Sequence, residues 1–376
     1  MKGKQMRTPN TVTYSGKALE EMKKNGAVAP SVLENIRKTA DEYLDLPILS
    51  VIYRKAVPPT KNPHEYASLA PYWWPNPDTP DGLPYVRRDG HINPDYYDDM
   101  TFERMADAVH VLSLAAYYFE EEKYAKRAEK LLYDWFLNPE TYMEPHAEYA
   151  QYIPGVCDGR GIGLIEFRFA YNIFNSVRIL ESIDLISEKT VRGVEKWFYD
   201  FANWMLTGDK GQDEDIQKNN HGTWYDVTLL TTAIFTKREF LAKKIASTAY
   251  VRRVRNHIKE DGTQPLELQR TKGIHYTLFN VWGMAIIGNI ADKLGYKEFW
   301  ENDEVRGKNL IKSAVDFIYP YLLSPETFPY EEIFSEPTDE DEARVLTFMS
   351  EHFEEYKEKA KLFVNKPYTW LAEPNI

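Results

Sequence analysis

Apolar side chains recur every three to four residues along most of the chain, a spacing that predicts helices. Between Thr101 and Phe119 they form one apolar stripe, and Thr101 stands where it can cap the helix N-terminus. The same period continues from Ser187 to Leu206, and Gly208 stands where a C-terminal cap belongs. We therefore expect an amphipathic helix at each place.

Nearly every other periodic stretch also predicts a helix. The expected segments are 16–25, 31–44, 122–137, 164–184, 224–235, 238–258, 276–294, 303–319 and 338–363. Sustained period-two alternation occurs nowhere, which disfavours a substantial β-domain. Short loops between helices favour antiparallel helical hairpins, as in an α-solenoid or a closed α/α toroid. Because no fixed-period repeat marks a solenoid, we expect an all-α fold, an α/α toroid or incomplete α/α barrel, formed by residues 1–376 as one domain.

Two longer segments interrupt the helical pattern. Residues 58–98 contain nine prolines among many aromatic side chains, so we expect an extended loop there. A loop of this length in a compact domain is usually functional. Residues 139–163 are also rich in proline and glycine and predict a second loop, and the charged stretch 208–218 looks loop-like. No composition typical of a linker separates two domains.

The composition excludes several classes of protein. Of the 376 residues, 43% are hydrophobic and 28% are charged, a balance that excludes disorder. No run of about 18 apolar residues predicts a membrane span, and residues 1–10 lack the apolar stretch of a signal peptide. The single cysteine, Cys157, cannot form an internal disulfide, and no cysteine and histidine spacing predicts a zinc site. We therefore expect no redox or thiolate–metal chemistry.

The charge is unevenly distributed along the chain. The net charge of −12 disfavours a nucleic-acid partner, because such binding draws its affinity from clustered cations. Residues 331–360 hold 11 acidic and 3 basic side chains, so the remaining residues carry a net charge of only −4. A locally positive surface is therefore compatible with the acidic total, and an acidic ligand is not excluded.

The first candidate constellation lies in the proline-rich loop 58–98. It combines Tyr72, Trp73 and Trp74 with Arg87 and Arg88. Flat aromatic rings suit the C–H faces of pyranose sugars, and guanidinium groups suit carboxylates, so the pattern favours a polymer of sugar acids. The alternative is a loop that folds its tryptophans into the protein core.

The second constellation runs from Asn219 to Asp226 and contains Asn220, His221, Trp224 and Tyr225. It precedes an apolar helix, so its polar groups are expected near a helix N-terminus, a site that favours anions. His221 and Tyr225 lie four apart, on one face if the helix begins early enough. The alternative is a structural histidine beside an asparagine turn and cap.

The third constellation runs from Glu267 to Tyr276. Arg270 and Tyr276 are six apart, so on a continuous helix they would lie about 120° apart around the axis. A bend at Gly273 would let both point into one cleft. Alternatively, Arg270 pairs with Glu267 at the surface and Tyr276 is a core side chain.

Motifs for other chemistries are absent from the sequence. There is no P-loop, nucleophile elbow, HExxH helix or calcium-binding loop, and the glycines at 159–163 follow no strand. A pair of glycosidase carboxylates could be recruited from Asp158, Asp226 or Glu267. With 58 acidic residues in the chain, such pairs also arise by chance.

Taken in order, the Tyr72–Pro75 loop, the Asn219–His221 run with Trp224 and Tyr225, and Arg270 ahead of Tyr276 resemble the alginate lyase superfamily. The resemblance spans residues 60–290. Polysaccharide lyase family 5 is its best-known branch, and the related family 38, which acts on glucuronan and mannuronan, looks closer. The resemblance implies an α/α toroid that cleaves a uronate polymer by β-elimination without a metal or cofactor.

The resemblance also implies roles for individual residues. The positions that match Asn220 and His221 hold the uronate carboxylate and neutralise it. The tyrosine that matches Tyr276 acts on the C5 proton and the C4 oxygen, and the arginine that matches Arg270 stabilises the tyrosinate or the enolate. In the family 5 pattern this arginine and tyrosine are seven apart, so the spacing of six leaves open whether Lys272 or another cation serves instead.

Physical reasoning agrees with these roles. Removing a proton beside a carboxylate places charge on that carboxylate, which preorganised donors stabilise. One tyrosine can be both base and acid only when the C5 proton and C4 oxygen lie on the same side of the ring, which holds for mannuronate and glucuronate but not for guluronate. Further substrate contacts are expected from Tyr72, Trp73, Trp74, Arg87, Arg88, Arg160, Trp224, Tyr225, Lys272 and His275.

Three classes of protein remain to be separated by experiment. The first is the uronate-polymer lyase, for which the resemblance implies a periplasmic or secreted mature chain. The second is an α/α-toroid glycoside hydrolase, which would leave saturated ends. The third is a non-catalytic protein that binds acidic glycans. The sequence does not decide between glucuronan and mannuronan, between endo and exo action, or the oligomeric state.

Overall fold

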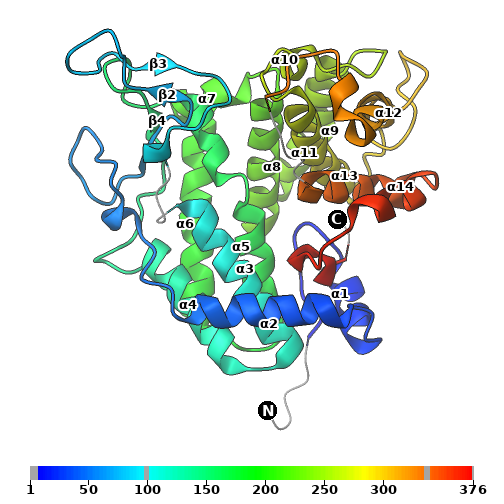
Figure 1. Cartoon of the computed structure of the whole chain (residues 1–376). Helices are drawn as coiled ribbons and strands as arrows, with labels where there is room; N and C mark the ends of the chain where they lie inside the picture. The colour runs from blue at the N-terminus through cyan, green and yellow to red at the C-terminus, as the bar shows by residue number, and fades with distance from the viewer. Residues whose placement is uncertain (1–6, 97–100, 334–338, 375–376) are drawn as a thin grey trace. The chain divides into compact units, whose positions relative to one another are not determined.

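The computed structural model describes residues 7–96, 101–333 and 339–374, and most of them are helical (Figure 1). The chain divides into two compact units. The first unit is built from residues before 214 together with 231–237 and 367–374, and the second from 214–230 and 238–366. Among the described helices, none is long and apolar enough to cross a membrane.

The first unit is a group of packed helices with a strongly aromatic core. Its helices are α1 (Gly16–Lys24), α2 (Pro30–Leu44), α3 (Phe102–Phe119), α4 (Glu122–Phe136), α5 (Ala170–Ser182) and α6 (Glu188–Thr207). α3 is buried along most of its length and packs against α2, α4 and α5. Phe174 stacks on Phe235 with ring centroids 4.4 Å apart, and Trp197 stacks on Phe201 at 5.1 Å.

Short strands accompany these helices. β1 (Ala67–Leu69) pairs in parallel with β4 (Tyr149–Tyr152), and β2 (Trp73–Trp74) pairs antiparallel with β3 (Val86–Arg87). The expected loop 58–98 therefore contains three strands and a 3₁₀ turn, Pro94–Tyr96, within its described part. Residues 97 and 98 lie outside the described residues.

The second unit is built around one buried helix. Its helices are α9 (Glu239–Ala249), α10 (Pro265–Leu268), α11 (Gly273–Lys293), α12 (Leu310–Leu323), α13 (Asp339–His352) and α14 (Tyr356–Phe363). α11 is apolar around most of its circumference and packs against α9, α10, α12 and α13. A π-helical segment, Tyr250–Arg255, continues α9. The two remaining helices, α7 (Asp209–Asp215) and α8 (Asn220–Phe235), have residues in both units.

Cap chemistry sets the helix ends that the sequence predicts best. The Thr101 side chain accepts a hydrogen bond from the backbone N–H of Arg104 at 3.1 Å, and Gly208 is the C-cap of α6, as predicted. The charged stretch 208–218 was predicted as a loop, and this is wrong, because it contains α7. α7 is polar around its whole circumference, so no apolar period reveals it.

Three predicted helices prove to be composite. Segment 164–184 begins as a 3₁₀ helix, Gly161–Phe167, before α5. Segment 238–258 changes from α9 to the π-helical turns, and 338–363 divides into α13 and α14. Apolar spacing is similar on both sides of each change, so the period alone does not locate these breaks.

Candidate active site

The Asn220–His221 motif lies in the first turn of α8, in the second unit. α8 begins four residues earlier than the apolar period predicts, because its first turn is polar. The Asn219 side chain caps this end, where its Oδ1 accepts a hydrogen bond from the backbone N–H of His221 at 3.2 Å. The predicted position of the motif at a helix N-terminus is confirmed.

A buried carboxylate holds His221. Its Nδ1 lies 3.0 Å from Oε1 of Glu214 in α7, and the Glu214 side chain is fully buried while that of His221 is 15% exposed. An ionised carboxylate only accepts hydrogen bonds, so Nδ1 carries the hydrogen of this contact. Nε2 is then the ring nitrogen that His221 offers to a further partner.

A second buried carboxylate holds Asn220. Glu267 in α10 is 1% exposed, and its Oε1 accepts from the backbone N–H of Asn220 at 2.6 Å. Its Oε2 accepts from Asn220 Nδ2 at 2.7 Å. Burial raises the pKa of the Glu267 carboxyl, against the hydrogen bonds from Asn220 and the charges of His221 and Arg270, which lower it. Residues of the Asn220–His221 motif and Arg270 therefore all interact with the Glu267 carboxylate.

Arg270 contacts Tyr276 directly. Its Nη2 donates to the Tyr276 hydroxyl at 3.0 Å, and its Cζ lies 4.0 Å from the centre of the tyrosine ring. The helical-wheel objection to a spacing of six does not apply, because α10 ends at Leu268 and α11 begins at Gly273, leaving Arg270 in the turn between them. The alternative surface pair between Arg270 and Glu267 is wrong, because Glu267 is buried against Asn220.

Lys272 and His275 flank this pair. Lys272 is 8% exposed, and its backbone forms a β-bridge with Glu332. His275 Nδ1 lies 3.3 Å from Oδ2 of Asp341, and its ring lies edge-on to Tyr276 with centroids 5.2 Å apart. His275 is therefore partly exposed beside the tyrosine, whereas Lys272 is held by its backbone.

Trp224 and Tyr225 are core side chains. Trp224 is fully buried, stacks on Phe279 with centroids 4.8 Å apart and lies edge-on to Trp282 at 5.4 Å. Tyr225 is 3% exposed, and burial raises the pKa of its hydroxyl. Because Asn220 and Trp224 are four apart, they share the buried face of α8. The expectation that these two aromatic rings contact substrate disagrees with this packing, and we do not retain it.

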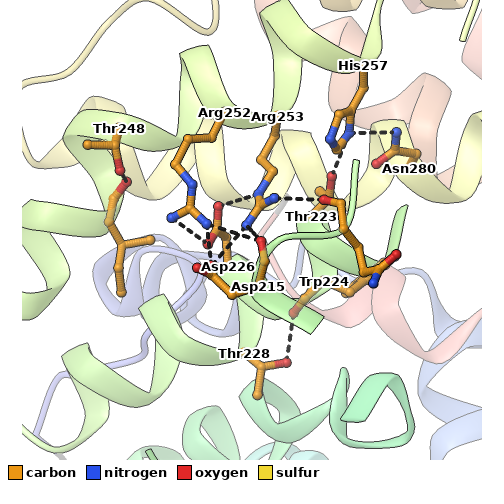
Figure 2. Close-up of polar contacts among 12 residues, drawn as sticks. Asp215, Thr223, Trp224, Asp226, Thr228, Thr248, Arg252, Arg253, His257 and Asn280 are labelled. Carbon is orange, nitrogen blue, oxygen red and sulfur yellow. Dashed lines mark hydrogen bonds and ion pairs between the residues drawn. The ribbon is translucent and has the colours of Figure 1, made fainter. Parts of the chain in front are cut away.

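Two arginines from the π-helical segment hold the connection between α7 and α8 (Figure 2). Arg253 is buried, and its Nε donates to Oδ2 of Asp226, also buried, at 2.6 Å. Its Nη1 donates to the backbone oxygen of Gln217 at 3.0 Å, and its Nη2 to that of Asp215 at 3.0 Å. Arg252 also binds the Asp215 carboxylate. π-Helical turns often occur at functional sites, and here one brings consecutive arginines to a single acidic cluster.

Arg253 approaches α8 so closely that only glycine fits at 222. A Cβ on Gly222 would lie 2.4 Å from Arg253 Nη1 and 2.1 Å from the backbone oxygen of Gln217. Real Cβ atoms essentially never come so near, so any side chain here displaces the arginine or the loop. A contact with Arg253, which is distant in the sequence, thus fixes the first turn of α8 at Gly222.

His257 links α8 to α11 through contacts with Thr223 and Asn280 (Figure 2). Its Nδ1 lies 3.4 Å from the Thr223 hydroxyl and 3.4 Å from Asn280 Nδ2. Asn280 Nδ2 also donates to Gln264 Oε1 at 2.7 Å. Burial, aided by the nearby charge of Arg253, lowers the pKa of His257 to about 3, so the ring is neutral and accepts at Nδ1.

The aromatic constellation in the first unit forms a small hairpin. Trp73 faces Arg87, and Trp74 faces Val86, in the β2–β3 pair. Tyr72, Trp73 and Trp74 are all half-buried, whereas the two arginines, Arg87 and Arg88, are exposed. The Arg88 guanidinium lies 5.2 Å from the Trp74 ring centre, and Arg87 pairs with Asp89 at 2.7 Å. The tryptophans are therefore neither fully exposed nor wholly part of the core.

Arg160 is oriented by a strained neighbour in the first unit. Its Nη2 donates to Gln151 Oε1 at 2.6 Å and its Nε to the Gln151 backbone oxygen at 3.2 Å. Gln151 is buried and has a φ of 51°, a left-handed conformation that costs energy for a residue with a side chain. The sequence signalled Arg160 only as one cation in a glycine-rich loop.

The carboxylates considered for hydrolysis are occupied by structural contacts. Asp226 is ion-paired with Arg253, and Glu267 is bonded twice to Asn220. Asp158 is exposed in the first unit. Within the part of the chain that the structure describes, no group of three or more histidine, cysteine, aspartate or glutamate side chains could hold a metal ion.

Comparisons with known proteins agree with the geometry. A family model described as alginate lyase matches residues 52–328. The crystal structure of an alginate lyase from Bacteroides ovatus matches with a TM-score of 0.90 and 32% identity, covering 97% of this chain and 99% of that chain. No curated protein matches.

More distant structures share the fold. Alginate lyase A1-III from Sphingomonas species A1 matches with a TM-score of 0.57 and 17% identity, over 90% of this chain and 86% of that chain. A variant of A1-III complexed with a tetrasaccharide also has a TM-score of 0.57 and 17% identity, over 89% of this chain and 84% of that chain. The predicted all-α fold of the α/α-toroid class is confirmed by these matches.

Proposed function

The chain belongs to the alginate lyase family and is a polysaccharide lyase, and from this premise we propose that it cleaves mannuronan or glucuronan by metal-independent syn β-elimination. The product would carry a 4,5-unsaturated uronate at the new non-reducing end. The observation that carries the proposal is the 3.0 Å hydrogen bond from Arg270 to the Tyr276 hydroxyl. It places the Arg270 cation beside Tyr276, the potential base, and both residues belong to the second unit, as do Asn220 and His221.

In this proposal Tyr276 is the base and then the acid. As a phenolate it takes the C5 proton, the C4–O bond breaks, and the phenol returns the proton to the leaving oxygen. A phenolate needs nearby positive charge, which the Arg270 guanidinium supplies at hydrogen-bond distance. Lys272 and His275 flank the tyrosine and would contact neighbouring uronate groups.

Asn220 and His221 would bind the carboxylate of the reacting uronate. Loss of the C5 proton moves negative charge onto that carboxylate, so donors fixed in advance lower the barrier. Asn220 Nδ2 has a second hydrogen besides the one given to Glu267, and His221 as the imidazolium would donate from Nε2–H while Nδ1–H binds Glu214. Their place in the first turn of α8 adds the positive end of the helix dipole.

Substrate binding away from the reacting sugar is assigned to the hairpin of the first unit and to Arg160. Half-buried Tyr72, Trp73 and Trp74 offer ring faces, and Arg87 and Arg88 offer guanidinium groups for carboxylates. An acidic polysaccharide is the partner that suits both. We further propose a periplasmic or secreted location, which cell fractionation with an antibody against the chain would test.

The decisive test compares wild type with Tyr276→Phe on polymannuronate, polyguluronate, glucuronan and hyaluronan. Wild type is expected to form an ultraviolet-absorbing unsaturated product from polymannuronate or glucuronan and little from polyguluronate. Tyr276→Phe should fold normally, by circular dichroism, and form none. An active Tyr276→Phe enzyme, or saturated ends detected by mass spectrometry as in a hydrolase, would refute the mechanism. Binding without product would indicate a glycan-binding protein.

A further inference from the structure

Two buried glutamates, Glu214 and Glu267, contact His221 and Asn220, the two residues that are proposed to bind the uronate carboxylate. Glu214 is fully buried and contacts His221 Nδ1 at 3.0 Å. Glu267 is 1% exposed and accepts both the backbone N–H and the side-chain Nδ2 of Asn220. The two glutamates come from different helices, α7 and α10, and each contacts a different member of the motif.

Acidic groups are at first sight unfavourable here, because they repel an anionic substrate. Burying a carboxylate also costs several kcal/mol unless hydrogen bonds compensate. Glu267 receives two such bonds from one residue, and Glu214 receives one from the imidazole. A glutamate that served packing alone could be replaced by an apolar side chain of similar size without this desolvation cost.

Each carboxylate fixes the orientation of a side chain that could otherwise turn over. An asparagine amide presents nitrogen on one side and oxygen on the other, and Glu267 accepts hydrogen bonds only, so Asn220 must place Nδ2 towards Glu267. Glu214 accepts the hydrogen on Nδ1 of His221, which leaves Nε2 facing away from Glu214, and in the imidazolium form Nε2–H is a donor to an anion. Both side chains are thereby held in one arrangement before substrate binds.

We propose that Glu214 and Glu267 are positioning residues of the lyase reaction, which orient His221 and Asn220 towards the carboxylate of the reacting uronate. The inference rests on the proposed function of that motif. In this proposal neither glutamate contacts substrate. Glu214 acts through His221, and Glu267 acts through Asn220. The repulsion that they add to substrate binding is offset in the transition state, where the oriented donors meet the larger charge.

The proposal predicts a fall in kcat rather than a rise in KM for Glu267→Gln. The new amide opposes an N–H to Asn220 Nδ2 and turns the asparagine over, while size and shape are conserved. Because removal of one oriented donor reduces kcat by about 10²–10³-fold, a misoriented donor should reduce it by about tenfold or more, with KM within about threefold. Glu267→Asp keeps the charge but is one methylene too short for both bonds, and it should also lose kcat.

Glu214 is tested with Glu214→Gln and Glu214→Ala. The glutamine oxygen can still accept from His221 Nδ1, so Glu214→Gln should retain most of kcat, whereas Glu214→Ala should lose about tenfold or more. At a pH at which the ring is neutral, the ¹⁵N signals of His221, assigned with a His221→Ala variant, should show hydrogen on Nδ1 in wild type and in Glu214→Gln. In Glu214→Ala the neutral ring should show both tautomers. This spectrum reports orientation without depending on turnover.

The chain offers matched controls. His110 Nε2 and Glu373 Oε2 form a largely buried pair at 3.0 Å in the first unit, so Glu373→Gln controls for loss of a histidine–glutamate contact. Asp303 is 2% exposed and binds Tyr250 and Arg255 in the second unit, so Asp303→Asn controls for Glu267→Gln. Both controls should lower thermal stability and leave kcat per folded molecule within about twofold.

The outcomes separate this inference from the proposed function. If wild type forms no unsaturated product, the proposed function fails. If wild type is active but Glu267→Gln, Glu267→Asp and Glu214→Ala keep wild-type kcat per folded molecule, the positioning role is wrong. An unchanged His221 tautomer in Glu214→Ala would overturn the role of Glu214 even where kcat falls. Losses of kcat confined to the motif variants, and absent from both controls, support the proposal.

Discussion

The neutral state of His257 makes the stability of the second unit sensitive to acid. Burial, aided by the charge of Arg253, lowers the pKa of His257 from 6.5 to about 3. Below pH 6.5 the unfolded chain therefore binds a proton that the folded chain refuses, so stability is complete above this pH and is lost as the pH falls towards 3. The loss between pH 7 and pH 5 is about 2 kcal/mol for this one group.

Protonation of His257 would disturb its contacts with two helices, α8 and α11. Nδ1 of His257 is the acceptor at 3.4 Å from both Thr223 in α8 and Asn280 in α11. A proton on this nitrogen would turn the Asn280 contact into a donor–donor pair and would require the Thr223 hydroxyl to accept instead of donate. Because Thr223 lies in the first turn of α8 and Asn280 one turn beyond Tyr276, the same event would loosen the two helices that carry the candidate catalytic groups.

Two measurements test this reasoning. The ring carbon signals of His257, assigned with His257→Asn, should stay those of a neutral imidazole from pH 7 down to pH 5. In urea unfolding over the same range, wild type should lose about 2 kcal/mol more than His257→Asn, whose amide oxygen keeps an acceptor near the Nδ1 position and does not titrate. A His257 midpoint near pH 6.5, or equal losses in both proteins, would refute the assignment.

Three further perturbations test other parts of the structure. Gly222→Ala places a Cβ 2.4 Å from Arg253 Nη1 and should lower the free energy of unfolding by about 1–3 kcal/mol in urea unfolding; an unchanged midpoint would contradict the close approach. Arg253→Met leaves buried Asp226 without its 2.6 Å partner and should cost about 3–5 kcal/mol by the same assay, with a loss below 1 kcal/mol counting against the clamp. Arg88→Ala removes an exposed cation over Trp74 and should raise KM several-fold with kcat unchanged, most strongly at low salt; a fall in kcat alone would argue against a binding role.

Local chemistry in the sequence predicted much of the fold. Thr101 and Gly208 were placed correctly at helix ends because a cap depends on one residue and its immediate neighbours. α7 was missed because it has no apolar stripe. The sequence therefore predicts a helix where one face is buried along its length, and fails where a short polar helix is held by contacts from elsewhere.

The candidate site was harder to predict because its key contacts are not local. Glu267 binds Asn220 across 47 residues of sequence, and no spacing within either motif indicates that pairing. Arg270 and Tyr276 would lie about 120° apart on one continuous helix, but α11 begins only at Gly273, so this angle does not apply. Trp224 was expected at the substrate because it neighbours the motif, yet it shares the inward face of α8.

The contact between Gly222 and Arg253 also constrains how this sequence can change over time. A side chain at 222 displaces both the Arg253 guanidinium and the Gln217 backbone oxygen, and loss of the guanidinium leaves buried Asp226 without its 2.6 Å partner. Neither Gly222 nor Arg253 can therefore vary alone without a loss of stability. In the terms of evolutionary genetics, these sites are epistatic, and relatives are expected to retain or exchange them together.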